Sequence, residues 1–396
     1  MMIPGYVLKL MERLNEAGYE CYVVGGALRS GLLSLEIKDY DLTTSALPSE
    51  VKQVFSDYRT IDTGIQHGTV TVLSESHPIE ITTYRTDGSY ADHRRPSSVA
   101  FSRSLQEDCA RRDFTINALC CDRDGTIRDF FGGREDLKQK LIRAIGDPDA
   151  RFDEDALRIL RALRFAAVLG FAIEEKTAAA LRRKKDLLSY VSMERIAAEC
   201  RGFLEGRAKA EILYEYRDVF AVFLPQLKRF SDEEMKMICA RLERCDADWT
   251  AAMALLLSDL DEDEVTGVMH SLKCSNAETD AVKNMILLKD MPLADRIDLR
   301  KLRHALKVPF PVYLAYRAAL DPETDTEKVS SLYEETSDDC VSLKDLCIRG
   351  SDLQALGLQG HAIREALDQA LLAVMEERTV NQPDAVLAYL RDQSIF

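Results

Sequence analysis

The spacing of hydrophobic residues changes twice along the first part of the chain. Apolar residues recur every three to four positions over residues 4–17, form a continuous run at 21–24, and alternate with polar residues over 67–73 and 79–84. The first spacing is typical of an amphipathic helix, whereas a period of two is typical of half-buried strands. The pattern therefore predicts a mixed α+β sheet domain over about the first 147 residues.

From Asp153 onward the spacing is helical almost without interruption, and it contains no convincing strand before the C-terminus. Turn-forming residues 146–148 precede the first long helix, and the polar stretch 321–339 interrupts the helical pattern later. We therefore predict an α+β fold, with an N-terminal mixed-sheet head followed by all-helical domains. The predicted domains are a head at 1–147, a neck at 148–205, a body at 206–320 and a tail at 321–396.

The composition is that of an ordinary globular protein, with 46% hydrophobic and 30% charged residues in 396. No run approaches the ~20 apolar residues that span a bilayer, and the N-terminus lacks a basic flank followed by an apolar run. We expect neither membrane anchor nor secretory signal, and a cytoplasmic location.

The ten cysteines are scattered without a CxxC pair, which predicts reduced core thiols, and the dispersed histidines imply that any metal is held by carboxylates.

The net charge of −15 is distributed unevenly: residues 1–200 carry −3 and residues 201–396 carry −12. Binding to nucleic acid depends on clustered cations, so a nucleic-acid partner must be recognised through local basic patches and shape. Candidate patches are Arg94-Arg95, Arg111-Arg112 and the four consecutive cations at 182–185.

The segment VVGGALRS at 23–30 joins an apolar strand to a helix through Gly25 and Gly26. Glycines at such a turn let a phosphate approach backbone N–H groups, and Arg29 adds a positive charge nearby. An ordinary strand-to-helix turn with a surface arginine explains the same residues, so this segment alone leaves both interpretations open.

The segment KDYDLTTS follows, and it places Asp39 and Asp41 two residues apart on a predicted strand. Both carboxylates then project from the same face, about 7 Å apart at Cα. A divalent cation between them would offset their repulsion, and a short spacing of oxygen ligands suits Mg²⁺ together with substrate phosphates. A pair of solvated acids on an edge strand is the alternative.

A third acid, Glu80, lies in the alternating strand HPIEITTYR between Ile79 and Ile81. We predict that it sits beside the core of the sheet, where an idle charge is unfavourable. Three carboxylates on two adjacent strands can bind two Mg²⁺ ions, one activating an attacking hydroxyl and the other holding a triphosphate. This arrangement predicts nucleotidyl transfer.

The ordered motifs of residues 20–205 resemble the bacterial class II nucleotidyltransferases, which comprise the tRNA CCA-adding enzymes and their poly(A) polymerase relatives. The motifs are GGALR, DYDLTTSALPSEV, EITTYRTDGSYADHRRPSSVAF, SLQEDCARRDFTINAL, FGGREDL, RFDEDALRILRALRFAAVLGF and SMERIAAE. The later segment LKDLCIRGSDLQALG at 343–357 is similar to the tail of the Gram-positive type of CCA-adding enzyme. The resemblance implies CTP and ATP as substrates, tRNA as partner, and a body and tail that bind it.

The resemblance also assigns roles to individual residues. It implies that Asp39 and Asp41 bind the metal, Mg²⁺, with Glu80 as the third acidic residue of the catalytic set, and that Gly26, Arg29 and Arg112 hold the triphosphate. The family's glycine motif normally continues Arg-Asp, whereas Ser30 follows Arg29 here. We expect a local structural effect and no loss of activity, because the metal-binding acids are present.

The segment EDALRILRALR is predicted to be helical, which would make Asp155 and Arg158 neighbours on one face. An ordinary surface salt bridge is the default interpretation of such a pair. In the family this segment acts as a protein template, and the resemblance assigns nucleotide binding to Asp155, Arg158, Arg161 and Arg164. Cytosine and adenine both present an amino donor beside a ring-nitrogen acceptor, so one acid and one arginine can accept C and A and reject U and G.

Residues 85–95 are polar and predict a loop. Family members that add only CC lack a flexible loop here, so its presence favours complete CCA addition. The alternatives are a poly(A) polymerase, which usually carries a basic C-terminal extension absent from this chain, or an enzyme that adds only CC or A. An inactive RNA-binding scaffold and a nucleotidyltransferase of small molecules are further rivals, disfavoured by the three acids and by the long helical region respectively.

Overall fold

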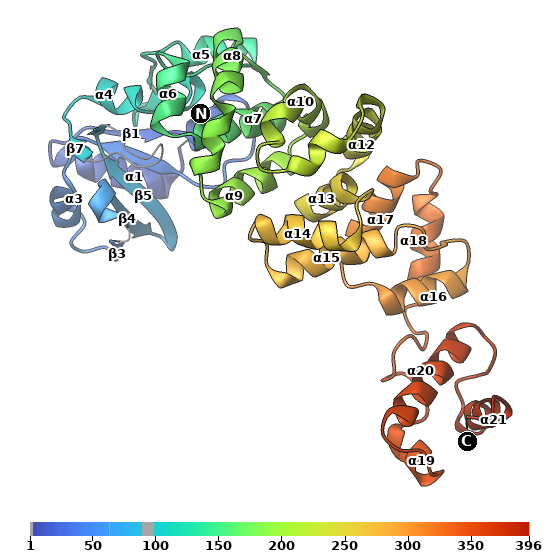
Figure 1. The fold of residues 1–396 in the computed structure, drawn as a ribbon. Helices are drawn as coiled ribbons and strands as arrows, with labels where there is room; N and C mark the ends of the chain where they lie inside the picture. Colours follow the sequence, from blue (N-terminus) through green and yellow to red (C-terminus); the bar gives the residue numbers. More distant parts are fainter. Residues whose placement is uncertain (1–2, 63, 89–98, 396) are drawn as a thin grey trace. The chain divides into compact units, whose positions relative to one another are not determined.

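The computed structural model describes residues 3–62, 64–88 and 99–395 (Figure 1). The chain divides into two compact units, Met1–Cys239 and Ala240–Phe396. The finer division into head, neck, body and tail remains a prediction. Within the described ranges, no helix combines the length and apolar character that crossing a bilayer requires.

A mixed seven-stranded sheet forms the centre of the N-terminal part, as the alternating pattern predicted. Its strand order is β3-β4-β5-β2-β1-β8-β9, and only the neighbours β2 and β5 run parallel. The strands are β1 (Cys21–Val24), β2 (Asp41–Thr44), β3 (Thr60–Ile61), β4 (Thr69–Ser74), β5 (His77–Thr83), β8 (Cys120–Cys121) and β9 (Ile127–Arg128).

Helices α1 (Gly5–Glu16) and α3 (Pro48–Val54) contact each other and strand β4, and α1 also contacts β1 (Figure 1). The fully buried Val7, Leu10 and Leu14 of α1 provide the apolar stripe that the helical spacing predicted. The same domain contains α2 (Gly26–Leu32), α4 (Leu105–Ala110), α5 (Gly133–Gln139) and the 3₁₀ helices η1 (Ile65–His67) and η2 (Thr115–Asn117).

The predicted loop at 85–95 begins as a strand. β6 (Arg85–Asp87) pairs antiparallel with β7 (Val99–Phe101), so the loop prediction is wrong for its first three residues. The remainder of the predicted loop, including Arg94-Arg95, lies outside the described residues.

The chain then becomes helical, with one exception to the prediction. A short strand β11 (Ala172–Ile173) pairs parallel with β10 (Leu141–Ile142). The two helices between these strands in the sequence form the connection. Helix α6 packs on α8, and α7 packs on α9. The helices are α6 (Pro148–Glu154), α7 (Leu157–Leu169), α8 (Glu175–Lys184), η3 (Lys185–Tyr190), α9 (Met193–Leu204), α10 (Lys209–Glu215), α11 (Arg217–Phe220), η4 (Pro225–Arg229) and α12 (Asp232–Arg244).

The second unit is built around α13 (Trp249–Leu257), which contacts both α15 and α17. Residues 251–257 of α13 are all buried, which is the pattern of a helix surrounded by others. The remaining helices are α14 (Glu262–Ser271), α15 (Asn276–Leu287), α16 (Arg296–Ala305), α17 (Phe310–Leu320), α18 (Thr326–Glu335), α19 (Gly350–Ala355), α20 (His361–Met375) and α21 (Pro383–Asp392).

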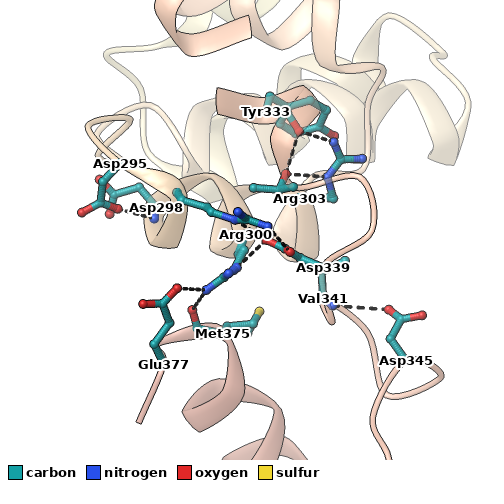
Figure 2. A network of polar contacts seen from close by, with 12 residues as sticks. Asp295, Asp298, Arg300, Arg303, Tyr333, Asp339, Val341, Asp345, Met375 and Glu377 are labelled. Atoms are coloured by element: carbon teal, nitrogen blue, oxygen red, sulfur yellow. Dashed lines mark hydrogen bonds and ion pairs between the residues drawn. The ribbon is translucent and has the colours of Figure 1, made fainter. Parts of the chain in front are cut away.

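A polar network joins α16 to the segment after α18 and to the end of α20 (Figure 2). Asp339 accepts from Arg296 and Arg300, with closest N···O distances of 2.5 and 2.6 Å. Arg300 also donates to the Met375 carbonyl and pairs with Glu377. The network therefore holds the last three helices onto the rest of the second unit.

Seven of the ten cysteines are buried, in agreement with the prediction of core thiols, whereas Cys274, Cys340 and Cys347 are partly exposed.

Candidate active site

Asp41 and Glu80 lie opposite each other on the neighbouring parallel strands β2 and β5. Asp41 is the first residue of β2 and is paired in register with Glu80. Adjacent strands lie about 4.8 Å apart, so the two side chains leave the same face of the sheet side by side. Asp39 precedes the strand, and the buried Tyr40 between two exposed aspartates places Asp39 on the same side as Asp41.

Glu80 is exposed and does not lie beside the core, which corrects the prediction. Its neighbours Ile79 and Ile81 are 2% and 0% exposed. Because successive side chains of a strand point to opposite faces, β5 turns these isoleucines to the core and Glu80 to the open face. The carboxylates thus gather on the accessible side of the sheet.

The charges of this group influence one another. Neighbouring groups remove part of the hydration of the Asp41 carboxylate although the residue is exposed. Together with the nearby Asp39 and Glu80 carboxylates, this desolvation raises the pKa of Asp41 to about 6, while Arg112 acts in the opposite direction. This concentration of negative charge fits a divalent cation. The described residues contain no group of three or more His, Cys, Asp or Glu side chains arranged to hold a metal ion. Magnesium usually takes one or two carboxylates together with water and substrate phosphates, so the protein alone need not complete such a site.

The glycine pair forms a turn flanked by two guanidinium groups. Gly25 has a φ of 67°, a left-handed conformation that favours glycine, and Gly26 begins α2. A Cβ at Gly25 would lie 3.8 Å from Arg112 Nη1, and a Cβ at Gly26 would lie 3.8 Å from Arg29 Nη2. The structure thus brings together Gly26, Arg29 and Arg112, the three residues predicted to hold a triphosphate.

Both arginines retain donors for an anion. The Nε atoms of Arg29 and Arg112 are buried and have no hydrogen-bond partner among the described residues. Burial and the nearby Arg164 and Arg161 lower the pKa of Arg29 to about 10, although Asp113 opposes them. Unpaired buried donors and mutually repelling cations are both stabilised by a nearby polyanion, so this cluster of arginines fits the triphosphate of a nucleotide.

The segment EDALRILRALR does not form one helix, which corrects the prediction. Helix α6 ends at Glu154, Asp155 is extended with φ −137° and ψ 104°, and α7 begins at Leu157. The Asp155 carboxylate accepts from the Leu157 backbone N–H at 3.1 Å and pairs with Arg195 at 3.0 Å. It therefore bonds the first backbone N–H of α7, and no ion pair joins it to Arg158 among the described residues.

Arg158 is buried, with 7% of the residue exposed, so the surface salt-bridge interpretation is also wrong. Its guanidinium pairs with Glu154 and donates to the carbonyls of Arg151 and Arg111 at 3.1 and 3.0 Å. These contacts use three of its five N–H donors. Arg158 thus links the start of α7 to the loop that carries Arg112.

The other two predicted nucleotide-binding arginines lie further along α7. Arg161 pairs with Asp113 at 2.6 Å, and Arg164 pairs with Glu199 of α9 at 2.5 Å. The guanidinium carbons of Arg161, Arg164 and Arg29 lie 5.4, 4.3 and 4.8 Å from the centre of the Phe165 ring. The structure therefore places Arg161 and Arg164 beside Arg29, on the triphosphate side of the site.

The sequence matches known families along most of its length. Residues 21–143 match the poly A polymerase head domain, residues 170–231 a probable RNA and SrmB- binding site of polymerase A, and residues 240–390 a putative tRNA nucleotidyltransferase domain 2. The CCA-adding enzyme of Limosilactobacillus fermentum is 37% identical over 386 residues, spanning 96% of this chain and 94% of that enzyme. The chain belongs to the CCA-adding enzyme family.

Solved structures of this family have the same fold. The crystal structure of the Bacillus stearothermophilus CCA-adding enzyme in complex with CTP matches with a TM-score of 0.86 and 31% identity, covering 99% of this chain and 98% of that one. The Thermotoga maritima CCA-adding enzyme complexed with tRNA_CCA matches in fold alone, with a TM-score of 0.68, 19% identity, and coverage of 99% and 96%.

Several polar residues of this CCA-adding enzyme family member were not predicted as part of the site. Asn117 accepts from Arg29, Asp113 accepts from Arg161, and Arg195 and Glu199 hold Asp155 and Arg164. Most of these partners are more than 30 residues apart in the sequence, so no local spacing indicates them. Asp108 is different, because the acid precedes Arg111 and Arg112 by three and four residues, a helical ion-pair spacing that the sequence displays.

The basic run at residues 182–185 is not a free cationic patch. Each cation pairs with a different acid, at distances between 2.5 and 3.3 Å. The pairs are Arg182 with Glu215, Arg183 with Asp149, Lys184 with Asp153 and Lys185 with Asp218. Because the nearby acids balance the four cations, this surface gives little support to the predicted phosphate-binding role.

Proposed function

We propose that this chain is a CCA tRNA nucleotidyltransferase, which adds and repairs the 3′-terminal CCA of tRNA from CTP and ATP and releases pyrophosphate without a nucleic-acid template. The observation that carries the proposal is the Asp41–Glu80 pair beside the glycine turn and its two arginines. This site lies in a chain that matches a CCA-adding enzyme along 96% of its length. The relatives crystallised with CTP and with tRNA_CCA support the same substrates.

Within this proposal, each group of side chains has one task. Gly26, Arg29 and Arg112 hold the triphosphate, because the glycine turn leaves room for it and the two arginines present unpaired Nε donors. Arg161 and Arg164 add positive charge around Arg29. The attacking group is the 3′ hydroxyl of the RNA, and the bond that breaks joins the α- and β-phosphates of the nucleotide.

The proposed metal ligands are Asp39 and Asp41, with Glu80 as the third acid of the catalytic set. Members of this family depend on a divalent metal, and we propose Mg²⁺ because oxygen ligands on adjacent strands suit it. When bound, the metal would lower the pKa of the attacking hydroxyl and neutralise developing negative charge. The protein's contribution is to hold the carboxylates at one edge of the triphosphate pocket, where Arg112 already balances part of the charge on Asp41.

Asp155 and Arg158 are proposed to read the base. Arg158 keeps two N–H donors beyond the three used in its contacts with described residues. The Asp155 carboxylate accepts from Leu157 and Arg195 within that part of the chain. The contacts fix both side chains while leaving an acceptor and a donor for the amino group and ring nitrogen of C or A. Fixed geometry is what a protein template requires.

We further propose that residues 1–147 catalyse, residues 148–205 select the base, and residues 206–320 and 321–396 bind tRNA. The cytoplasm is the expected location, because that is where tRNA and nucleoside triphosphates meet.

The test uses tRNA transcripts that end before the CCA, after the first C, and after CC. Each transcript is incubated with Mg²⁺ and labelled CTP, ATP, UTP or GTP, singly and together. We expect CTP alone to add two residues, CTP with ATP to complete CCA and then stop, and UTP and GTP to add nothing. Asp41→Ala serves as the inactive control.

Other products would identify the alternatives. A long adenosine tail on any RNA end would identify a poly(A) polymerase, and termination after CC or addition of A alone would identify a partial enzyme. Absence of any product in the wild-type protein would refute the proposal.

A further inference from the structure

Asp108, which has no assigned role so far, is a fully buried carboxylate at the centre of the site. It lies on α4, its residue is 0% exposed, and each of its oxygens contacts two groups. Oδ1 accepts from Arg111 at 2.8 Å and from the Arg85 backbone N–H at 3.4 Å. Oδ2 contacts Arg112 Nη2 at 3.3 Å and Thr43 Oγ1 at 3.1 Å.

The four contacts connect parts of the site that are far apart in the sequence. Thr43 lies on β2 two residues after Asp41, so one contact reaches the strand of the predicted metal ligands. Arg112 reaches the turn at Gly25, so another contact reaches the predicted triphosphate pocket. The Arg111 carbonyl accepts from Arg158, which extends the connection to α7.

The position of Arg112 depends on this carboxylate. Among the described residues, Asp108 is the ion-pair partner of Arg112, and it contacts a single nitrogen, Nη2. Nε has no partner, and Nη1 lies against Gly25. A flexible arginine held on one side by a buried acid presents its other donors in a fixed direction.

We propose that Asp108 is a positioning residue for the nucleotide's triphosphate: it holds Arg112 against the Gly25-Gly26 turn and in register with the β2 strand that carries Asp41. The inference rests on the proposed function and adds to it a residue that binds neither substrate nor metal. Asp108 acts through Arg112, so its loss should weaken phosphate binding and leave base selection unchanged.

The first experiment measures Asp108→Asn, which has the same shape but lacks the charge. We expect the KM for CTP and for ATP to rise equally, by about tenfold, as for the loss of a hydrogen bond to a charged group. The value of kcat should change by less than about threefold, because the lost contact serves binding in both ground and transition states. Competitive inhibition by inorganic pyrophosphate should weaken by the same factor as the KM, and UTP and GTP should remain excluded.

A double-mutant cycle with Arg112→Ala tests whether Asp108 acts through Arg112. In that background Asp108→Asn should raise the KM by less than about twofold, because the residue it positions is already gone. Full additivity of the two changes would overturn the proposal.

Asp136→Asn is the matched control. Asp136 is also a buried acid of the head, 4% exposed, and it accepts from the Thr115 hydroxyl at 2.6 Å and from Arg143 at 3.1 Å. It should lower the melting temperature as Asp108→Asn does but leave the KM for CTP and pyrophosphate inhibition within about twofold of wild type. An equal rise in KM for both variants would reduce Asp108 to a structural role and refute the inference.

Thr43→Val provides a second variant if Asp108→Asn does not fold. It removes the hydroxyl contacts to Asp108 at 3.1 Å and to the Thr82 carbonyl at 3.2 Å, and we expect an increase of about threefold in the KM for CTP with a small decrease in melting temperature. An unchanged KM would count against the proposal. Binding of pyrophosphate with Mg²⁺ is also measured by calorimetry without tRNA. This measurement tests the inference by itself, because it does not depend on CCA addition. The proposed function fails only if the wild-type protein adds no CCA.

Discussion

At the scale of single residues, Asp41 shows how one position in a strand sets the chemistry of the site. It begins β2, faces away from the core, and is paired with Glu80 across the one parallel strand pair of the described seven-stranded sheet. Its pKa of about 6 reflects crowding and two neighbouring carboxylates, so the protein holds like charges together at neutral pH. Such an arrangement reduces stability and is expected where the charges serve a ligand.

We therefore expect Asp41→Asn to lower the rate of nucleotide addition by at least about a hundredfold. The same change should raise the melting temperature in EDTA at pH 8. The neutral amide removes repulsion from Asp39 and Glu80, so the metal-free protein gains stability. Activity assays and thermal unfolding with and without Mg²⁺ measure both effects.

Asp57→Asn is the control for this prediction, because Asp57 is an exposed acid of the same domain that pairs with Arg13 at 2.8 Å. It should change neither activity nor stability appreciably. A melting temperature of Asp41→Asn at or below that of wild type would contradict the interpretation of charge repulsion.

The proposed base selection also rests on single residues, and Asp155→Asn tests it with little disturbance of the backbone. The amide oxygen of asparagine can still accept from the Leu157 N–H at the start of α7. The second carboxylate oxygen, however, is replaced by an NH2 group, which donates and does not accept. We expect addition of C and A to fall by about ten- to a hundredfold and the preference over UTP to narrow, since a good pair with a base contributes ~1–3 kcal/mol.

Competition between labelled CTP and UTP on the same tRNA measures this change. Unaltered rates and unaltered rejection of UTP would place base reading elsewhere.

At the scale of elements, the break between α6 and α7 has the largest effect on the site. The sequence DEDALRIL has a continuous helical spacing, yet Asp155 adopts an extended conformation and its side chain accepts from the Leu157 backbone N–H at the start of α7. A hydrogen bond from an aspartate side chain to the nearby backbone competes with a continuous helix, and Arg195 from α9 pairs with the same carboxylate. The break turns Arg158 inward, where it contacts the Arg111 carbonyl.

Helix α8 and the start of η3 carry the four consecutive cations at residues 182–185, and all of them are paired with acids. Replacing all four by Gln should therefore leave the affinity for tRNA and the slope of log K against log salt nearly unchanged, because few counterions are released from cations that are already paired. Thermal unfolding should show a modest loss of stability.

Filter binding at several salt concentrations tests this expectation. A slope that flattens by two or more units would show that tRNA displaces the acids and that the run does bind phosphate.

At the scale of the whole molecule, the chain forms two compact units, and most of its negative charge lies after residue 200. In the second unit, acids and arginines hold the elements together. Arg300 contacts Asp339 (Figure 2), and Arg296 pairs with the same carboxylate. Lys301 pairs with Glu376. The acidic composition thus reflects internal ion pairs as well as solvated surface.

The Asp339 network predicts a defined pH dependence of stability. Its arginine partners lower the pKa of Asp339 to about 2, so its stabilising effect is present above the unfolded-state pKa of about 4 and is lost as the pH falls from about 4 to about 2. We expect Asp339→Asn to reduce the free energy of unfolding by about 1–2 kcal/mol at pH 5–8, with the difference shrinking below pH 4.

Urea unfolding at several pH values measures this difference, with Asp368→Asn as a control. Asp368 pairs with Arg364 on the exposed surface of α20 at 2.9 Å, and its replacement should have little effect. An equal loss of unfolding free energy in the two variants would show that the network around Asp339 stabilises the protein no more than an exposed ion pair does.

The sequence alone determined the elements and the chemical groups of the site. The strand at 21–24 and the helix that begins beside Pro4 occur where the apolar spacing predicted them, because burial of one face dictates that spacing. The glycine turn and the two aspartates were also recognisable, because local geometry limits which residues such a turn and such a strand accept.

Only the tertiary structure decided which groups meet and which are accessible. It placed Glu80 on the open face opposite Asp41, broke the helix at Asp155, buried Arg158, and paired the cations at 182–185 with distant acids. It also placed Asp108 between Arg112 and Thr43, which are separated by 69 positions in the chain. Each of these results involves at least one partner that the fold brings from a remote position, such as Arg195 for Asp155 and Thr43 for Asp108, and periodicity along a sequence carries no information about such contacts.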